Sequence, residues 1–106
     1  PTLVTASRAG RAQRLDFPTR CLDVCAACDG ETVSFWAGVP RPGVARDDVW
    51  AWLVEGVAAV CERATARGVV PSLEPEPGML VETVDDWRRL RADLGSAGAA
   101  LRLALD

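Results

Sequence analysis

The sequence contains no histidine and no lysine, and both absences restrict the chemistry that it could perform. Histidine is the usual general base and the commonest metal ligand in proteins. Lysine is the side chain that forms Schiff bases, and all 12 cationic side chains here are arginine. The 106 residues taken alone are therefore poorly equipped for catalysis.

Long apolar runs and an excess of positive charge are missing as well. No apolar stretch reaches the length of a membrane span. The net charge of −3 and the isoelectric point near 4.9 disfavour a nucleic-acid partner, because phosphate backbones attract positively charged surfaces. The chain is nevertheless 49% hydrophobic and 25% charged, which is the composition of a folded globular domain.

Four short β-type runs alternate with three segments of helical periodicity. The β-type runs cover residues 2–6, 32–37, 69–74 and 100–105. The predicted helices cover residues 16–30, opened by Asp16 as N-cap, then 48–67 and 83–95. This alternation is typical of parallel βαβ units, so the sequence predicts an α/β fold with a parallel sheet. Pro71 stands inside the third run, where a proline removes a donor from the strand ladder.

Two of the predicted helices carry specific end signals. Gly68 is predicted to stop the second helix, and Thr83 with Asp86 forms a variant capping box before the third, which Gly95 ends. Trp87, Leu90 and Leu94 are its predicted buried face. The second helix has one apolar stripe, made of Val49, Leu53, Val57, Val60, Cys61 and Ala64.

Acidic residues stand at the ends of the last two β-type runs. Glu74 ends the third run and is followed by Pro75, Glu76 and Pro77, and Asp106 comes 32 residues after Glu74. Because the carboxyl ends of parallel strands lie at one rim, these carboxylates would converge there. Hard oxygen ligands suit Mn²⁺ or Mg²⁺. A solvated acidic loop that caps the next helix is the alternative interpretation.

The stretch 68–106, with its strand–Leu-Glu-Pro turn and its terminal Leu-Ala-Leu-Asp, resembles the xylose isomerase-like TIM barrels. This family includes sugar phosphate isomerases and epimerases and, more distantly, endonuclease IV. The resemblance implies that residues 1–106 are a single partial TIM-barrel domain, an incomplete segment of a (β/α)8 barrel that covers about strands three to six. A typical barrel has about 250 residues, and Pro1 in place of an initiator Met also suggests a fragment.

The resemblance also implies roles for individual residues. Glu74 matches the family's metal-ligating glutamate and could serve as the catalytic base, and Asp106 matches a second metal ligand. The implied cofactor of the complete protein is a divalent metal, Mn, Mg, Co or Zn, and the implied reaction is proton transfer through an enediolate. The family's histidine ligands would fall after Asp106, so the fragment alone is expected to be inactive.

Four further residues are candidates for binding the substrate. Trp36, near the end of the second β-type run, is a candidate platform for a sugar ring. Glu76 could bind substrate or face solvent. Residues 7–11 resemble the loop after the barrel's third strand, where Arg8 and Arg11 could bind an anionic group or remain solvated.

Cys21, Cys25 and Cys28 have the spacing of the radical SAM iron–sulfur signature. Ala27 stands where that signature carries an aromatic residue, and on a helix these offsets simply share one face. Small buried hydrophobic side chains are therefore the alternative interpretation. A zinc site would need a fourth ligand, and Cys61 is distant in the sequence. Cysteines without the spacing of a disulfide scaffold favour a cytoplasmic location.

Three functions remain open at this point. The first is a metal-dependent sugar or sugar phosphate isomerase or epimerase, and the second is a non-catalytic metabolite-binding or export-associated barrel protein. The third, DNA repair in the manner of endonuclease IV, conflicts with the acidic isoelectric point. The expected partner is a small sugar or hydroxy-carbonyl molecule, without nucleic acid or membrane. The sequence leaves the substrate, the metal and a homo-oligomeric state open, and exposed sheet edges predict pairing or aggregation.

Overall fold

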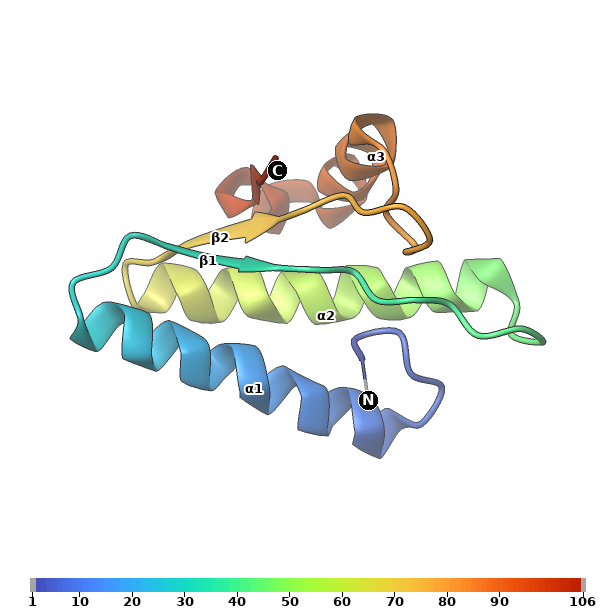
Figure 1. The fold of residues 1–106 in the computed structure, drawn as a ribbon, viewed down its shortest axis with the longest axis horizontal. Coiled ribbons are helices and arrows are strands. Elements are labelled where there is room, and N and C mark those ends of the chain that lie inside the picture. The colour runs from blue at the N-terminus through green and yellow to red at the C-terminus, as the bar shows by residue number, and fades with distance from the viewer. Residues whose placement is uncertain (1, 106) are drawn as a thin grey trace.

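The structure is a computed structural model that describes residues 2–105. Its elements, in chain order, are α1 (Arg8–Ala27), β1 (Thr32–Phe35), α2 (Arg46–Ala66), β2 (Val70–Leu73), α3 (Val84–Leu94), the 3-10 helix η1 (Gly95–Ala100) and β3 (Arg102–Leu103). The strands form one parallel sheet in the order β1-β2-β3. Figure 1 shows the helices side by side, with α2 between α1 and α3. The predicted α/β fold with a parallel sheet is confirmed.

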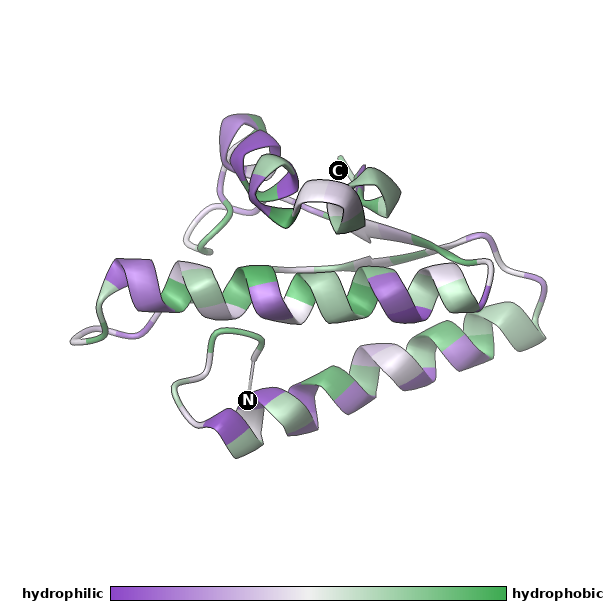
Figure 2. Ribbon diagram, turned by 180° about the vertical axis from the view of Figure 1, so that it is seen from behind, coloured by the Kyte–Doolittle hydropathy of each residue, from purple (hydrophilic) through white to green (hydrophobic). Residues whose placement is uncertain are grey.

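The core lies between α2 and the sheet. The predicted stripe of α2 is buried in full: Val49, Leu53, Val57, Val60, Cys61 and Ala64. Phe35 of β1 and Leu73 of β2 belong to the same apolar cluster, whereas Ser34 faces away and is exposed. This alternation is the two-residue period of a strand. Figure 2 shows green, hydrophobic residues recurring along α2 between purple, hydrophilic ones.

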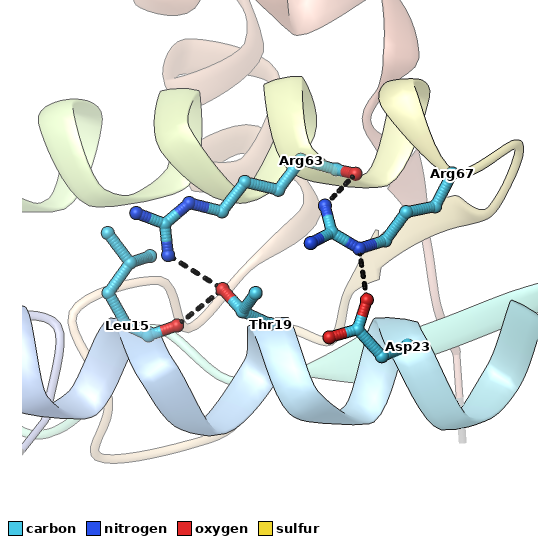
Figure 3. Close-up of polar contacts among 5 residues, drawn as sticks. All are labelled: Leu15, Thr19, Asp23, Arg63 and Arg67. Atoms are coloured by element: carbon cyan, nitrogen blue, oxygen red, sulfur yellow. Dashed lines mark hydrogen bonds and ion pairs between the residues drawn. The ribbon is translucent and has the colours of Figure 1, made fainter.

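Helix α1 joins this core mainly through polar contacts, because only Pro18 and Leu22 of its side chains are fully buried. Arg63 of α2 donates to the Thr19 hydroxyl at 2.7 Å, and that hydroxyl donates to the Leu15 carbonyl at 2.8 Å. Arg67 pairs with Asp23 one turn further along (Figure 3). These contacts hold the two helices together where the apolar surface of α1 is small.

β2 occupies the centre of the sheet although it contains Pro71. Val70 and Glu74 donate their N–H groups to carbonyls of the β1 segment, at 2.8 and 3.0 Å. Neighbouring residues of a strand direct their backbone groups to opposite sides, so the missing N–H of Pro71 falls on the β3 side. β3 pairs with β2 only from Ser72 onward. The proline therefore removes no ladder hydrogen bond.

Two predictions for the beginning of the chain are wrong. Residues 2–6 form no strand, because the backbone N–H of Thr2 donates to the Thr5 hydroxyl at 2.7 Å and the Thr5 N–H donates to the Thr2 carbonyl at 3.3 Å. Such local bonds compete with a strand ladder. Helix α1 begins at Arg8 rather than near Asp16, because the Ser7 hydroxyl caps it by accepting from Gly10 at 3.1 Å. Residues 7–11 are thus a helix start and not a loop.

The other helix signals agree with the sequence, with one difference at the end of the chain. Gly68 follows α2 with a φ of +67°, and the capping box of Thr83 and Asp86 opens α3. Leu90 and Leu94 are buried as predicted, whereas Trp87 is only half-buried. The run 100–105 forms a strand of two residues only, because η1 extends through Ala100. None of the helices in residues 2–105 meets the length and hydropathy that crossing a membrane requires.

Candidate functional site

Trp36 and Glu74 lie together at the carboxyl end of the sheet. The register pairs Phe35 with Leu73, so the residues that follow these two stand next to each other. The Glu74 N–H donates to the Phe35 carbonyl at 3.0 Å, which fixes the backbone of Glu74 beside β1. The Trp36 indole Nε1–H then donates to the Glu74 carboxylate oxygen Oε2 at 3.2 Å. The structure thus brings together two of the predicted site residues from different strands.

The Glu74 carboxylate retains the capacity to bind a cation. The side chain is half-buried, and within residues 2–105 no arginine forms an ion pair with it. Its hydrogen bond to Trp36 uses Oε2, whereas Oε1 accepts no hydrogen bond from a described residue. A charged oxygen with free lone pairs is the ligand type that Mg²⁺ and Mn²⁺ prefer. Glu74 therefore fits one position in the coordination shell of such an ion.

The described residues do not complete that shell. Within residues 2–105, no three His, Cys, Asp or Glu side chains lie close enough together to hold a metal ion. The second predicted ligand, Asp106, lies outside the described residues. The chain before it runs beside the end of β2, since the Ala104 N–H donates to the Leu73 carbonyl at 3.1 Å. The role of Asp106 as a metal ligand stays a prediction.

Glu76 lies in the turn that follows β2. Its backbone N–H donates to the Val81 carbonyl and its carbonyl accepts from Met79, both at 3.1 Å. The turn is also joined to the segment after β1, because the Leu80 N–H donates to the Gly38 carbonyl at 2.9 Å. The Glu76 side chain is half-buried and forms no hydrogen bond to another residue in 2–105. Its role in substrate binding stays a prediction.

Arg8 and Arg11 line a cavity of about 240 Å³ between α1 and α2, and neither Trp36 nor Glu74 lines it. Arg11 stacks over the Trp52 ring at 4.5 Å from its centroid. Its guanidinium also donates to the carbonyls of Thr5 and Ala6 at 2.9 and 2.7 Å. Arg11 thereby holds the N-terminal turn against the helices. Neither arginine joins Trp36 or Glu74, and anion binding by them stays a prediction.

The cysteines form no cluster that could hold iron and sulfide. Cys21 and Cys25 are half-buried on α1 and Cys28 is exposed at its end. The Cys25 thiol points to the Thr32 carbonyl at 3.8 Å. Burial raises the pKa of Cys61 to about 11, which keeps this thiol protonated at neutral pH. Within residues 2–105 no three ligand side chains group around a metal position, but the expectation of three buried cysteine side chains is wrong, because Cys28 lies exposed after the end of α1.

The Trp36–Glu74 hydrogen bond is the feature that the sequence analysis missed. Both residues were predicted for the site, but separately, because they are 38 positions apart. Their contact depends on the register between β1 and β2. The usable signal was positional: each residue directly follows the last residue of a strand in a parallel sheet.

The sequence model of the xylose isomerase-like TIM barrel family matches residues 2–106. The chain belongs to this family. The match confirms the resemblance, and the open parallel sheet with its helices is a segment of such a TIM barrel. No curated protein sequence matches the chain.

Solved structures of this TIM-barrel architecture are similar to the chain. The protein SMc04130 of Sinorhizobium meliloti 1021 is 26% identical with a TM-score of 0.79, over 96% of this chain and 38% of that one. A D-psicose 3-epimerase solved in the presence of D-fructose is 21% identical with a TM-score of 0.80, over 99% and 38%. The D-psicose 3-epimerase of Clostridium cellulolyticum H10, solved with D-tagatose, is 19% identical with a TM-score of 0.81, over 99% and 38%. The chain thus shares the fold of sugar epimerases and spans 38% of their length.

Proposed function

We propose that the chain is part of a divalent-metal-dependent isomerase or epimerase of sugars or sugar phosphates. Such an enzyme removes a proton from a carbon beside the carbonyl to form an enediolate and then returns a proton to the enediolate. The observation that carries this proposal is the placement of Glu74, which directly follows β2 with a carboxylate oxygen that no described residue occupies. The family and the fold of the neighbouring epimerases support it. Those neighbours were solved in the presence of D-fructose and with D-tagatose, which supports a ketose as the substrate.

In this proposal the chain supplies part of a barrel, about strands three to six. Glu74 and Asp106 are metal ligands, and the remaining ligands come from outside residues 1–106. The metal, Mn, Mg, Co or Zn, supplies a Lewis acid that polarises the carbonyl and hydroxyl oxygens of the sugar. The fraction of a barrel in the chain implies that the 106 residues alone are inactive. The proposed compartment is the cytoplasm.

Glu74 and Trp36 have separate tasks in the proposed reaction. Glu74 binds the cation through Oε1 and removes or returns a proton at the carbon beside the carbonyl. Trp36 is 51% exposed, so its ring can line the space in which the sugar lies. Arg8, Arg11 and Glu76 are candidates for the outer contacts of the substrate.

Solvent deuterium exchange tests the proposed function. The complete reading frame that encodes the chain is expressed and incubated with Mn²⁺ and D-fructose, D-tagatose or D-psicose in D₂O. An enediolate route incorporates deuterium at the carbon next to the carbonyl, which NMR detects. We expect Glu74→Gln to slow this exchange by about 100-fold or more, because the variant loses the charge and the base.

Glu62→Gln is the matched control, because Glu62 is exposed on α2 in the helical layer. It makes the same chemical change and should exchange at the wild-type rate. Binding of one of these ketoses without any exchange in the wild-type protein would indicate a non-catalytic binding protein. Full exchange by Glu74→Gln would overturn the assigned role of Glu74.

A further inference from the structure

We propose that Trp36 is a positioning residue for the metal ligand Glu74: its indole N–H holds Oε2, and Oε1 is thereby presented to the cation. This inference rests on the proposed function and assigns a task to a side chain that the sequence suggested only as a sugar platform. It follows from the one side-chain hydrogen bond that Glu74 accepts from residues 2–105.

The backbone alone places Trp36 and Glu74 next to each other. Trp36 follows the last residue of β1, and Glu74 follows the last residue of β2. The ladder continues across this point, since Glu74 donates its N–H to the Phe35 carbonyl at 3.0 Å. The donor and the acceptor therefore start from fixed, adjacent main-chain positions. What remains free is the rotation of the glutamate side chain, and the 3.2 Å bond to the indole restricts it.

The chemistry of the indole suits this task. An indole N–H only donates, so it holds a carboxylate oxygen without competing for the cation. It also carries no charge and does not titrate, so the hydrogen bond persists at every pH at which Glu74 is ionised. Groups that hydrogen-bond a metal ligand in this way fix its orientation, and their loss typically weakens metal binding by about 10- to 100-fold.

The ring of Trp36 is itself held beside the sheet. It lines two small cavities of about 110 and 160 Å³, and Leu3 and Arg14 line both of them. The aromatic body thus has neighbours on the α1 side, while its N–H points across the strand ends to Glu74. Replacing the indole by a phenyl ring keeps most of this body and removes only the donor. Trp36→Phe is therefore the variant that isolates the hydrogen bond.

A second pair in the same chain provides a matched control. The Trp50 indole Nε1–H donates to the Asp93 carboxylate at 2.8 Å, between α2 and α3 and away from the strand ends. Trp50→Phe removes the same type of bond. Mn²⁺ binding to the complete reading frame is measured by calorimetry for both variants. We expect Trp36→Phe to raise the Kd for Mn²⁺ by about 10- to 100-fold and Trp50→Phe to leave it unchanged.

A spectroscopic measurement on the wild-type protein tests the positioning role without a substitution at either tryptophan. Indole N–H signals are resolved in a ¹H–¹⁵N spectrum, and Mg²⁺ is added as a diamagnetic probe. We expect the Trp36 signal to shift on addition of Mg²⁺ while the Trp50 signal stays in place, because only the Trp36 partner binds the ion. The shift should disappear in Glu74→Gln.

The results separate this inference from the function on which it rests. If Glu74→Gln weakens Mn²⁺ binding but Trp36→Phe binds like the wild type, the positioning role is overturned and the proposed function stands. If Glu74→Gln binds Mn²⁺ as tightly as the wild type, the proposed metal site itself fails. A Trp36 indole signal that ignores Mg²⁺ in a protein that binds it also overturns the positioning role.

Discussion

Two tryptophan–carboxylate pairs in this chain have the same chemistry and different surroundings. Trp50 is 7% exposed and donates to Asp93, and Arg89 stacks over the Trp50 ring and lies 3.9 Å from the same carboxylate. Trp36 is 51% exposed and donates to Glu74, whose carboxylate pairs with no arginine in residues 2–105. The first carboxylate has an arginine beside it, whereas no described arginine pairs with the second.

Under the proposed function, this difference separates a pair that stabilises the fold from a pair that serves a ligand. Arg89 lies beside Asp93 and stacks over the buried Trp50 ring, so this pair contributes to the packing between two helices. No described arginine pairs with Glu74, so in the proposed site its charge is available to a cation.

Truncating Trp50 and Trp36 to alanine should give the largest difference between the two pairs in the free energy of unfolding. Trp50→Ala is expected to lower the free energy of unfolding by about 3–5 kcal/mol, because it empties a buried site and leaves Asp93 without its donor. Trp36→Ala is expected to lower it by about 1 kcal/mol or less, because half of the ring is already in water. Urea denaturation of the complete reading frame measures both. Similar losses of folding stability from the two truncations would contradict the distinction between the two pairs.

Neutralising the two carboxylates should give a smaller difference in the free energy of unfolding, again with the larger loss at the Trp50–Asp93 pair. Asp93→Asn is expected to cost about 1 kcal/mol of stability, because it weakens the charge-assisted bond to Trp50 and removes the partner of Arg89. Glu74→Gln is expected to leave the stability unchanged within about 0.5 kcal/mol, since no described cation depends on it. Thermal unfolding at neutral pH compares the two. A destabilised Glu74→Gln would show that this carboxylate is part of the fold.

Much of the fold was predictable because its determinants are local. The stripe of α2, the stop at Gly68 and the capping box at Thr83 each depend on residues within one or two turns, and the structure contains all three. The start of α1 was misjudged although its signal is local too, because Ser7 competes with Asp16 as an N-cap. Both residue types cap helices well, and periodicity alone does not choose between them.

The parts that were not predictable depend on partners far along the chain. Residues 2–6 have the composition of a strand, but a strand needs a neighbouring ladder, and their hydroxyl groups bond locally instead. Glu74 could be assigned to a rim because the strand before it and the prolines after it mark its position. Its bond to Trp36 could not be predicted, because it depends on the register of β1 against β2, and α2 separates these two strands in the sequence.

A third carboxylate, Asp86, accepts hydrogen bonds from backbone groups rather than from an indole. Its substitution should have the smallest effect on the free energy of unfolding. Its oxygen accepts from the N–H groups of Glu82 and Thr83 at 3.0 and 3.1 Å. Partial burial by itself would raise the pKa of Asp86, but these bonds and the nearby Arg46 lower it below its ordinary value of 3.8. The carboxylate therefore stabilises the folded state at pH above 3.8, and this contribution is lost as the pH falls through the lowered pKa.

Asp86→Asn should accordingly cost about 0.5 kcal/mol at neutral pH, and this cost should shrink as the pH falls through the lowered pKa of Asp86. Urea denaturation from neutral pH down to the lowest pH at which the protein stays folded measures the difference between the two proteins. A difference that stays constant with pH would mean that the capping bonds do not depend on the charge of Asp86.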